Sequence, residues 1–190
     1  LDPFRGSSTG ADAGAVIDLS YSKERMLRDI GASPEAPLVL DLSDPEARAR
    51  FASLDQARIL VRAHEPGEIL PGLGAALSAR FSGVAPERLQ RDLLAPIKKA
   101  VGNADKRGNQ RDPRKWITVG VVATRAGVCV EVSDEGPGFE VAETCARLRA
   151  GTRYFSHGGS GFRKYDKANA VISFAGGGST FLARFLTPGG

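Results

Sequence analysis

The sequence has few cysteines and histidines, and it contains no long apolar run. Among its 190 residues are two cysteines, Cys129 and Cys145, and two histidines, His64 and His157, which lie far apart. This set matches neither a disulfide framework nor a zinc motif, so we expect both thiols to be small buried hydrophobes in a reducing cytoplasm. The absence of an apolar run of roughly eighteen residues argues against a membrane span. Residues 1–10 also lack the charged-then-apolar order of a secretion signal.

Positive charge is in modest excess and is unevenly distributed. The net charge is +4, and the hydrophobic share of 42% is ordinary for a globular domain. The basic residues concentrate in one part of the chain, at Lys98, Lys99, Lys106, Arg107, Arg111, Arg114 and Lys115. Such a cluster suggests nucleic acid, but it is not interleaved with the aromatic side chains that stack on single-stranded bases. The pattern therefore argues against nucleic acid as the partner.

The chain divides into three segments by composition and pattern. Residues 1–14 are rich in Gly, Ser and Asp and are expected to form a flexible leader. Residues 15–55 are an N-terminal extension that either extends a sheet or docks a partner, and residues 56–188 form the main domain. The extension predicts two strands and two helices: a strand at 16–19, a helix from Ser22 to near Gly31, a strand at 37–42 and a helix from Ser43 to about Leu54.

The main domain combines β-rich runs with helical patterns. Strands are predicted at 58–63, 116–123, 128–133, 171–174 and 181–185, and helices at 71–81 and from Pro86 onward. The last four strands pair as two hairpins. Pro66-Gly67 is expected to be a turn, and Pro96 is expected to kink the helix that begins at Pro86. The sum is an α+β fold with a mixed, mostly antiparallel sheet and helices packed on one face.

The stretch from Val130 to Phe139 carries the strongest chemical signal. Alternating valines predict a strand, Asp134 stands at its end, and Gly136 and Gly138 follow with a proline between them. Glycines have no Cβ, so the backbone can turn sharply and pass close to a ligand. A carboxylate beside such a backbone can accept hydrogen bonds from a flat heterocycle. A strand followed by an ordinary turn has the same composition, so this stretch alone leaves both interpretations open.

Two further stretches favour the ligand-binding interpretation. Residues 98–109 (KKAVGNADKRGN) end a helical pattern upstream, while 158–162 (GGSGF) and 176–180 (GGGST) follow downstream. In this order and at these spacings, they and the Asp134 stretch resemble the N, G1, G2 and G3 boxes of the GHKL superfamily, the gyrase, histidine-kinase and MutL type of ATP-binding domain. The chain is most similar to the compact anti-sigma-factor serine kinases, over roughly residues 58–185. This resemblance implies a two-layer Bergerat sandwich.

The resemblance implies roles for residues that would hold the base and a metal ion. Asn103 corresponds to the Mg²⁺ ligand of the N box, and an amide oxygen suits that hard cation. Asp134 would accept the adenine amino group, while Gly136 and Gly138 would let adenine and ribose approach closely. Thr180 would help to hold adenine through a water molecule. A helix-terminal asparagine and a strand threonine are the plain structural alternatives for Asn103 and Thr180.

Other residues would meet the phosphates by the same resemblance. Gly159 and Gly161 can present backbone N–H groups where a helix begins at Phe162. Lys106 and Arg107 can meet phosphate or form the solvated basic end of a helix. The region that corresponds to the ATP lid, residues 140–157, contains three arginines, and which of them contacts phosphate stays open: Arg147, Arg149 and Arg153.

One position departs from the family pattern. The anti-sigma-factor kinases carry an acidic general base four positions before the N-box asparagine, one helical turn away on the same face. Here that position is Lys99, and an ammonium cannot accept a proton in that role. We expect Lys99 to point toward the phosphates as a fixed positive charge, unless the kink at Pro96 turns it into solvent.

The resemblance implies a regulatory protein that binds ATP or ADP with Mg²⁺. Its partner would be a protein, such as a sigma factor or an anti-anti-sigma-like regulator, and the chain could form a homodimer. The lysine at the base position favours a nucleotide-binding regulator with impaired or absent phosphotransfer. The alternatives are an active serine/threonine protein kinase or ATPase, and a structural domain whose boxes have lost their function.

Overall fold

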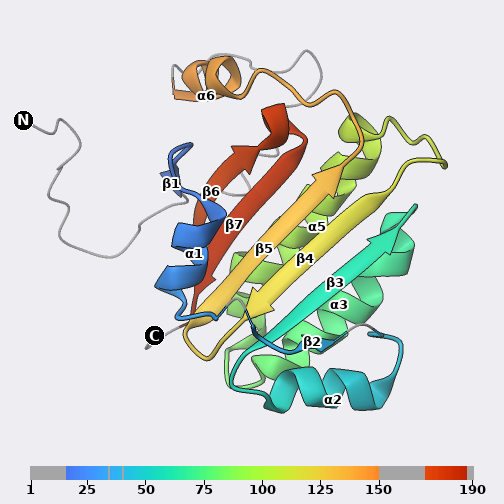
Figure 1. Ribbon diagram of the computed structural model, residues 1–190, viewed down its shortest axis with the longest axis vertical. Helices are drawn as coiled ribbons and strands as arrows, with labels where there is room; N and C mark the ends of the chain where they lie inside the picture. The colour runs from blue at the N-terminus through green and yellow to red at the C-terminus, as the bar shows by residue number, and fades with distance from the viewer. Residues whose placement is uncertain (1–15, 34, 40, 150–169, 188–190) are drawn as a thin grey trace, which may run out of the picture.

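The computed structural model describes residues 16–33, 35–39, 41–149 and 170–187. Its strands are β1 (Val16–Ile17), β2 (Leu38–Val39), β3 (Ala57–Ala63), β4 (Ile117–Ala123), β5 (Gly127–Asp134), β6 (Ala170–Ala175) and β7 (Thr180–Leu186). Within the described residues they form one seven-stranded sheet in the order β1-β6-β7-β5-β4-β3-β2 (Figure 1). Pairing is parallel at the two edges, β1 with β6 and β2 with β3, and antiparallel elsewhere. The mixed, mostly antiparallel sheet and both predicted hairpins are confirmed.

The helices begin at residues whose side chains or rings suit a helix start. They are α1 (Lys23–Asp29), α2 (Pro45–Ser53), α3 (Pro66–Arg80), α4 (Pro86–Leu89), α5 (Ala95–Asn103) and α6 (Val141–Arg149). The Ser22 hydroxyl caps α1 by accepting from the Arg25 N–H at 3.3 Å. The Asp44 carboxylate caps α2 by accepting from two backbone N–H groups. Helix starts in the N-terminal extension were therefore predictable from the cap residues.

The prediction of a turn at Pro66-Gly67 is wrong, because α3 begins with these residues. Glu65 and Glu68 form a reciprocal capping box, and Pro66 occupies the first turn, where its missing N–H costs nothing. The helix therefore starts five residues before the predicted start at Pro71, which lies inside it.

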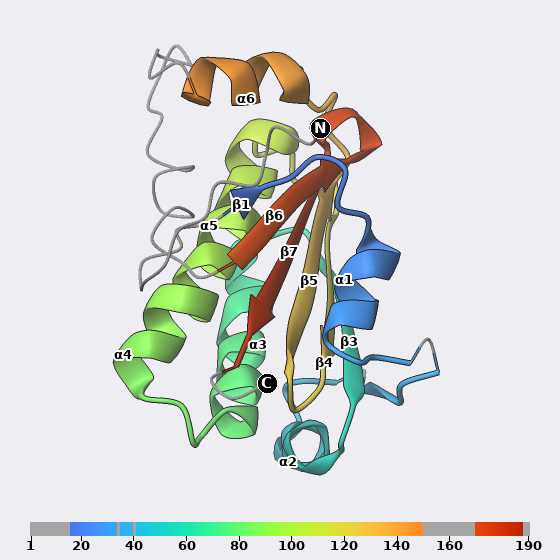
Figure 2. The same ribbon diagram turned by 90° about the vertical axis from the view of Figure 1, so that its left-hand side faces the viewer.

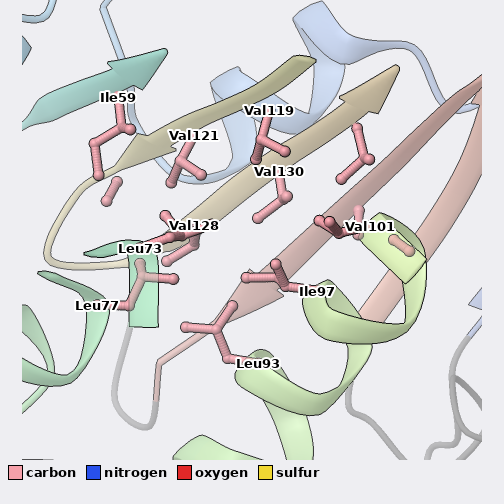
Figure 3. Close-up of a cluster of buried hydrophobic side chains, with 14 of the residues drawn as sticks. Ile59, Leu73, Leu77, Leu93, Ile97, Val101, Val119, Val121, Val128 and Val130 are labelled. Carbon is pink, nitrogen blue, oxygen red and sulfur yellow. The ribbon is translucent and has the colours of Figure 1, made fainter. Parts of the chain in front are cut away.

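The main core lies between one face of the sheet and helices α3 and α5. Side chains at alternate positions of β3, β4 and β5 point to this face and meet residues from the helical layer (Figure 3). The labelled members are Ile59, Val119, Val121, Val128 and Val130 from the sheet, and Leu73, Leu77, Leu93, Ile97 and Val101 from the helical layer. Full burial of such side chains stabilises the fold by about 1.5–3 kcal/mol each.

The N-terminal extension completes the fold on both edges and on the second face of the sheet. β1 and β2 are the edge strands, and α1 packs against β5 and β7 on the face opposite α3, α4 and α5 (Figure 2). A second apolar cluster forms there, from Tyr21, Met26, Ile30, Cys129 and Leu182. The expectation that helices cover one face only is therefore wrong for α1. The reason is that Cys129 and Leu182 alternate with core-facing residues and leave an apolar strip that needs a cover.

Both cysteines are buried and unbridged, as expected. Burial raises the pKa of the Cys129 thiol to about 12, so this group is protonated and unreactive at neutral pH. In the part of the chain that the structure describes, no helix is long and apolar enough to cross a membrane.

Pro96 disturbs its helix through a π-helical turn on its N-terminal side. Residues Gln90–Leu94 are π-helical, and the Ala95 N–H donates to the Gln90 carbonyl, five residues back. Proline removes one backbone donor and crowds the carbonyl four residues before it, and the wider π turn relieves both problems. From Ala95 to Asn103 the helix is regular, so Lys99 and Asn103 lie one turn apart on one face.

Replacement of Met26 by alanine should show how much α1 contributes to stability. Met26 is fully buried in the cluster under α1, so its truncation should lower the free energy of unfolding by about 2–4 kcal/mol. Urea denaturation followed by circular dichroism measures this, with Leu19→Ala, at a residue 39% exposed, as the control. An equal effect of both changes would show that α1 is not part of the folded core.

Candidate functional site

Three segments that are distant in sequence meet at the end of β5. They are the end of α5 with the π-helical segment Ala104–Gly108, the loop from Asp134 to Phe139, and the β6–β7 turn at Gly176–Gly178. α6 lies above the same end of the sheet in both views (Figure 1, Figure 2). Antiparallel pairing creates this meeting point, because β5 ends where the β6–β7 hairpin turns.

The backbone of Gly108 lies directly against the carboxylate of Asp134. A Cβ on Gly108 would stand 2.1 Å from Asp134 Cγ, and a Cβ on Gly136 would stand 2.0 Å from the Gly108 carbonyl oxygen. Real Cβ atoms do not approach other atoms this closely, so position 136 needs glycine, and any side chain at position 108 would displace the Asp134 carboxylate. The N-terminal half of the predicted site, residues 98–109, is therefore in contact with the Asp134 loop.

The same loop contacts the β6–β7 turn on its other side. The Phe139 N–H donates to the Gly177 carbonyl at 2.9 Å, and the Asp134 N–H donates to the Ser179 carbonyl at 3.0 Å. Gly138 has a φ of +72°, and a Cβ there would stand 2.1 Å from the Gly177 oxygen. Gly138 is therefore required both by its backbone conformation and by the close approach of the turn.

Asp134 is a half-buried carboxylate that lies against the backbone of Gly108. Burial raises its pKa above the ordinary value, while the Gly136 N–H, which donates to Oδ1 at 2.9 Å, and the charge of Lys115 lower it. Burial dominates, so the free carboxylate is destabilised relative to one in water. An incoming hydrogen-bond donor would stabilise its charged form.

Asn109 is the residue at this site that sequence reasoning missed. Its side chain is 2% exposed, donates from Nδ2 to the Trp116 carbonyl at 2.9 Å and accepts from the Glu135 N–H at Oδ1 at 2.8 Å. It thus ties the start of β4 to the residue after Asp134. In sequence it is a loop asparagine after a glycine, and no local pattern separates it from an exposed one.

Thr180 lies close to the Asp134 loop on the neighbouring strand. Its hydroxyl is 3.1 Å from the Ser133 hydroxyl, on the residue immediately before Asp134. Thr180 is half-buried, and the Ser133 hydroxyl is the hydrogen-bond partner of its side chain. By strand alternation, Ser133 and Thr180 point to the sheet face of Leu182, opposite the face that Asp134 shares with Val132.

The residues expected to contact phosphate and Mg²⁺ lie on α5 and the turn that follows it. Asn103 and Lys99 are half-buried, whereas Lys98, Lys106 and Arg107 are exposed. Among the described residues, no group of three or more His, Cys, Asp or Glu side chains could hold a metal ion. A metal at Asn103 would therefore need oxygen ligands from a bound phosphate as well.

Part of the predicted phosphate site lies outside the described residues. This holds for Gly159, Gly161, Arg153 and the helix predicted from Phe162. Of the other arginines of this region, Arg147 lies on α6, where it forms an ion pair with Glu143 one turn away.

A scan of the sequence against protein-family models finds no match, and a search of curated proteins finds no relative. Any function assigned to this chain therefore has to follow from its own residues and their geometry.

Proposed function

We propose that this protein is a GHKL-type regulator that binds ATP or ADP with Mg²⁺ and that resembles the anti-sigma-factor serine kinases. The supporting observation is the meeting of Gly108, the Asp134 loop and the β6–β7 turn at one end of the sheet. These are the stretches that resemble the N, G1 and G3 boxes, and they come from parts of the chain up to about seventy residues apart.

A flat heterocycle is the ligand that suits the Asp134 loop. The loop offers one partly desolvated carboxylate that could accept from an adenine amino group, and Gly136 and Gly138 let this loop pack closely against Gly108 and the β6–β7 turn. Mg²⁺, when bound, would neutralise phosphate charge, and the Asn103 amide oxygen is the protein ligand available to it.

The lysine at position 99 favours a regulator without phosphotransfer over an active kinase. A half-buried ammonium one turn before Asn103 can attract a triphosphate but cannot remove a proton from an attacking hydroxyl. The protein would then act by binding a regulatory partner, such as a sigma factor or an anti-anti-sigma-like protein, in a nucleotide-dependent way. The second candidate, an active serine/threonine kinase or ATPase, predicts a labelled partner after incubation with labelled ATP.

Isothermal titration with Mg-ADP tests nucleotide binding. The wild type should bind ADP in the micromolar range, and Asp134→Asn should bind about tenfold or more weakly, because a hydrogen bond to a charged acceptor is lost. No detectable binding at millimolar nucleotide, together with no effect of Asp134→Asn, would refute the proposed function.

The same substitution should stabilise the empty protein slightly. The pKa of Asp134 is raised in the folded state, so its contribution to stability falls as pH rises from its ordinary pKa through the raised value. At neutral pH its charge is a net cost, which the neutral amide of Asp134→Asn would remove. Because the group is half-exposed and screened, the gain should be below about 1 kcal/mol, and it should vanish below about pH 4. Thermal unfolding of both proteins across this pH range measures it, and a loss of stability at pH 7 contradicts it.

A further inference from the structure

We propose that Asn109 is the positioning residue that sets the base specificity of this site. The inference rests on the proposed nucleotide-binding function and adds a residue, at the end of the 98–109 stretch, to which the resemblance assigned no role. Both polar atoms of the Asn109 side chain are bonded to protein groups, so Asn109 does not contact a ligand directly. It acts on Asp134 through the backbone of Glu135.

The amide of Asn109 uses one donor and one acceptor to join two segments. Nδ2 donates to the Trp116 carbonyl and Oδ1 accepts from the Glu135 N–H, at 2.9 and 2.8 Å. Its own N–H donates to the Ala104 carbonyl at 2.7 Å, which fixes it to the end of the helical segment. At 2% exposure, these bonds are shielded from water, so their loss is not compensated by solvent.

Asn109 holds this part of the loop from the α5 side through the Glu135 N–H, while the Glu135 carboxylate is held by the Trp116 N–H and by Arg62. On the other side, the Asp134 N–H is held by Ser179 and the Phe139 N–H by Gly177. The Gly136 N–H is held by Asp134 itself. Without Asn109, the Glu135 N–H loses its acceptor, and the backbone that leads to Gly136, whose N–H donates to Asp134 Oδ1, is held less firmly, so the carboxylate is less fixed.

The backbone that follows Asn109 supports this role. Gln110 and Arg111 have φ values of +56° and +59°, although neither is a glycine. Two successive left-handed residues cost free energy and persist only where the surrounding structure demands them. Here they reverse the chain directly after Asn109 and allow its side chain to turn inward between β4 and the Asp134 loop.

Base discrimination is the property that this arrangement controls. Adenine offers an amino group to the Asp134 carboxylate, whereas hypoxanthine presents an oxygen at the same place, which the carboxylate repels. A carboxylate held in one direction rejects the wrong base, because the partly desolvated carboxylate is then left without a donor. A carboxylate that can rotate discriminates weakly.

The test compares ADP and IDP affinities by titration calorimetry for the wild type and Asn109→Ala. We expect the wild type to prefer ADP by about tenfold or more and the variant by less than about threefold. The affinity for magnesium tripolyphosphate, which has no base, should be the same in both. Asn109→Ser is the second variant, because its hydroxyl is too short to span both partners but can bind water, which favours folding.

Thr124→Ala is the matched control. Thr124 is also buried, and its hydroxyl also donates one bond, to the Ile30 carbonyl, and accepts one, from the Ala126 N–H, at the opposite end of β4. This variant should keep the wild-type preference for ADP. A folded Asn109 variant with the wild-type preference, or an equal loss in Thr124→Ala, overturns the inference but not the proposed function. A wild type that binds ADP and IDP equally overturns the inference as well, whereas a wild type that binds neither overturns both.

Discussion

Replacement of Gly108 by alanine should abolish nucleotide binding and leave the protein folded. The new Cβ would lie 2.1 Å from Asp134 Cγ and 2.3 Å from each carboxylate oxygen. These atoms end a short side chain that can rotate away, so we expect a stability loss of only about 1–3 kcal/mol. The rotation moves the proposed base acceptor and places a methyl group where it stood. ADP affinity should fall by about a hundredfold or more, measured by calorimetry beside a urea denaturation curve.

Gly102→Ala is the control for this change. Gly102 lies in α5, and a Cβ there would meet nothing within 4 Å. Alanine at this position should leave ADP affinity unchanged and stabilise the helix by about 0.5–1 kcal/mol. If Gly108→Ala binds ADP as well as the wild type does, Asp134 is not the base acceptor.

Replacement of Lys99 by glutamate should weaken nucleotide binding and introduce slow ATP hydrolysis. Lys99 lies one turn before Asn103 in a regular stretch of helix, so both side chains share a face. The change replaces an attractive charge with a repulsive one near the phosphates, and affinity for ATP should fall by about a hundredfold. The new carboxylate occupies the general-base position of the resembled kinases and can accept a proton from water or a hydroxyl group. Calorimetry and a phosphate-release assay, made on the same preparations, measure the two effects.

Lys98→Glu tests whether the effects of Lys99→Glu depend on the position of the charge or only on the change in net charge. It changes the net charge by the same amount, but Lys98 is exposed and lies on another face of the helix. This variant should keep most of the ATP affinity and should release no phosphate. Strong hydrolysis by the wild type that Lys99→Glu leaves unchanged would show that the catalytic position lies elsewhere.

Together, these two experiments separate the base subsite from the phosphate subsite. Gly108→Ala should affect ligands that carry adenine, whereas Lys99→Glu should affect any ligand with a triphosphate, including tripolyphosphate. If neither change alters nucleotide affinity, the protein does not bind nucleotides at this end of the sheet.

Local pattern was sufficient where the deciding contacts are between near neighbours. The Ser22 cap and the β4–β5 hairpin depend on residues a few positions apart and were predicted, as was a helix beginning near Asp44. The start of α3 at Pro66 was also local, and the capping box of Glu65 and Glu68 was the signal that could have revealed it.

The sequence by itself determined the α+β class, the mixed sheet and the glycines that flank Asp134, because strand periodicity, caps and glycine spacing act over short distances. Tertiary structure alone decided that α1 covers the second face, that Gly108 lies against Asp134 and that Asn109 holds Glu135. Each of these contacts joins residues more than twenty positions apart. These contacts depend on how the sheet and helices pack. The local sequence around a loop glycine or asparagine does not indicate which strand the residue will contact.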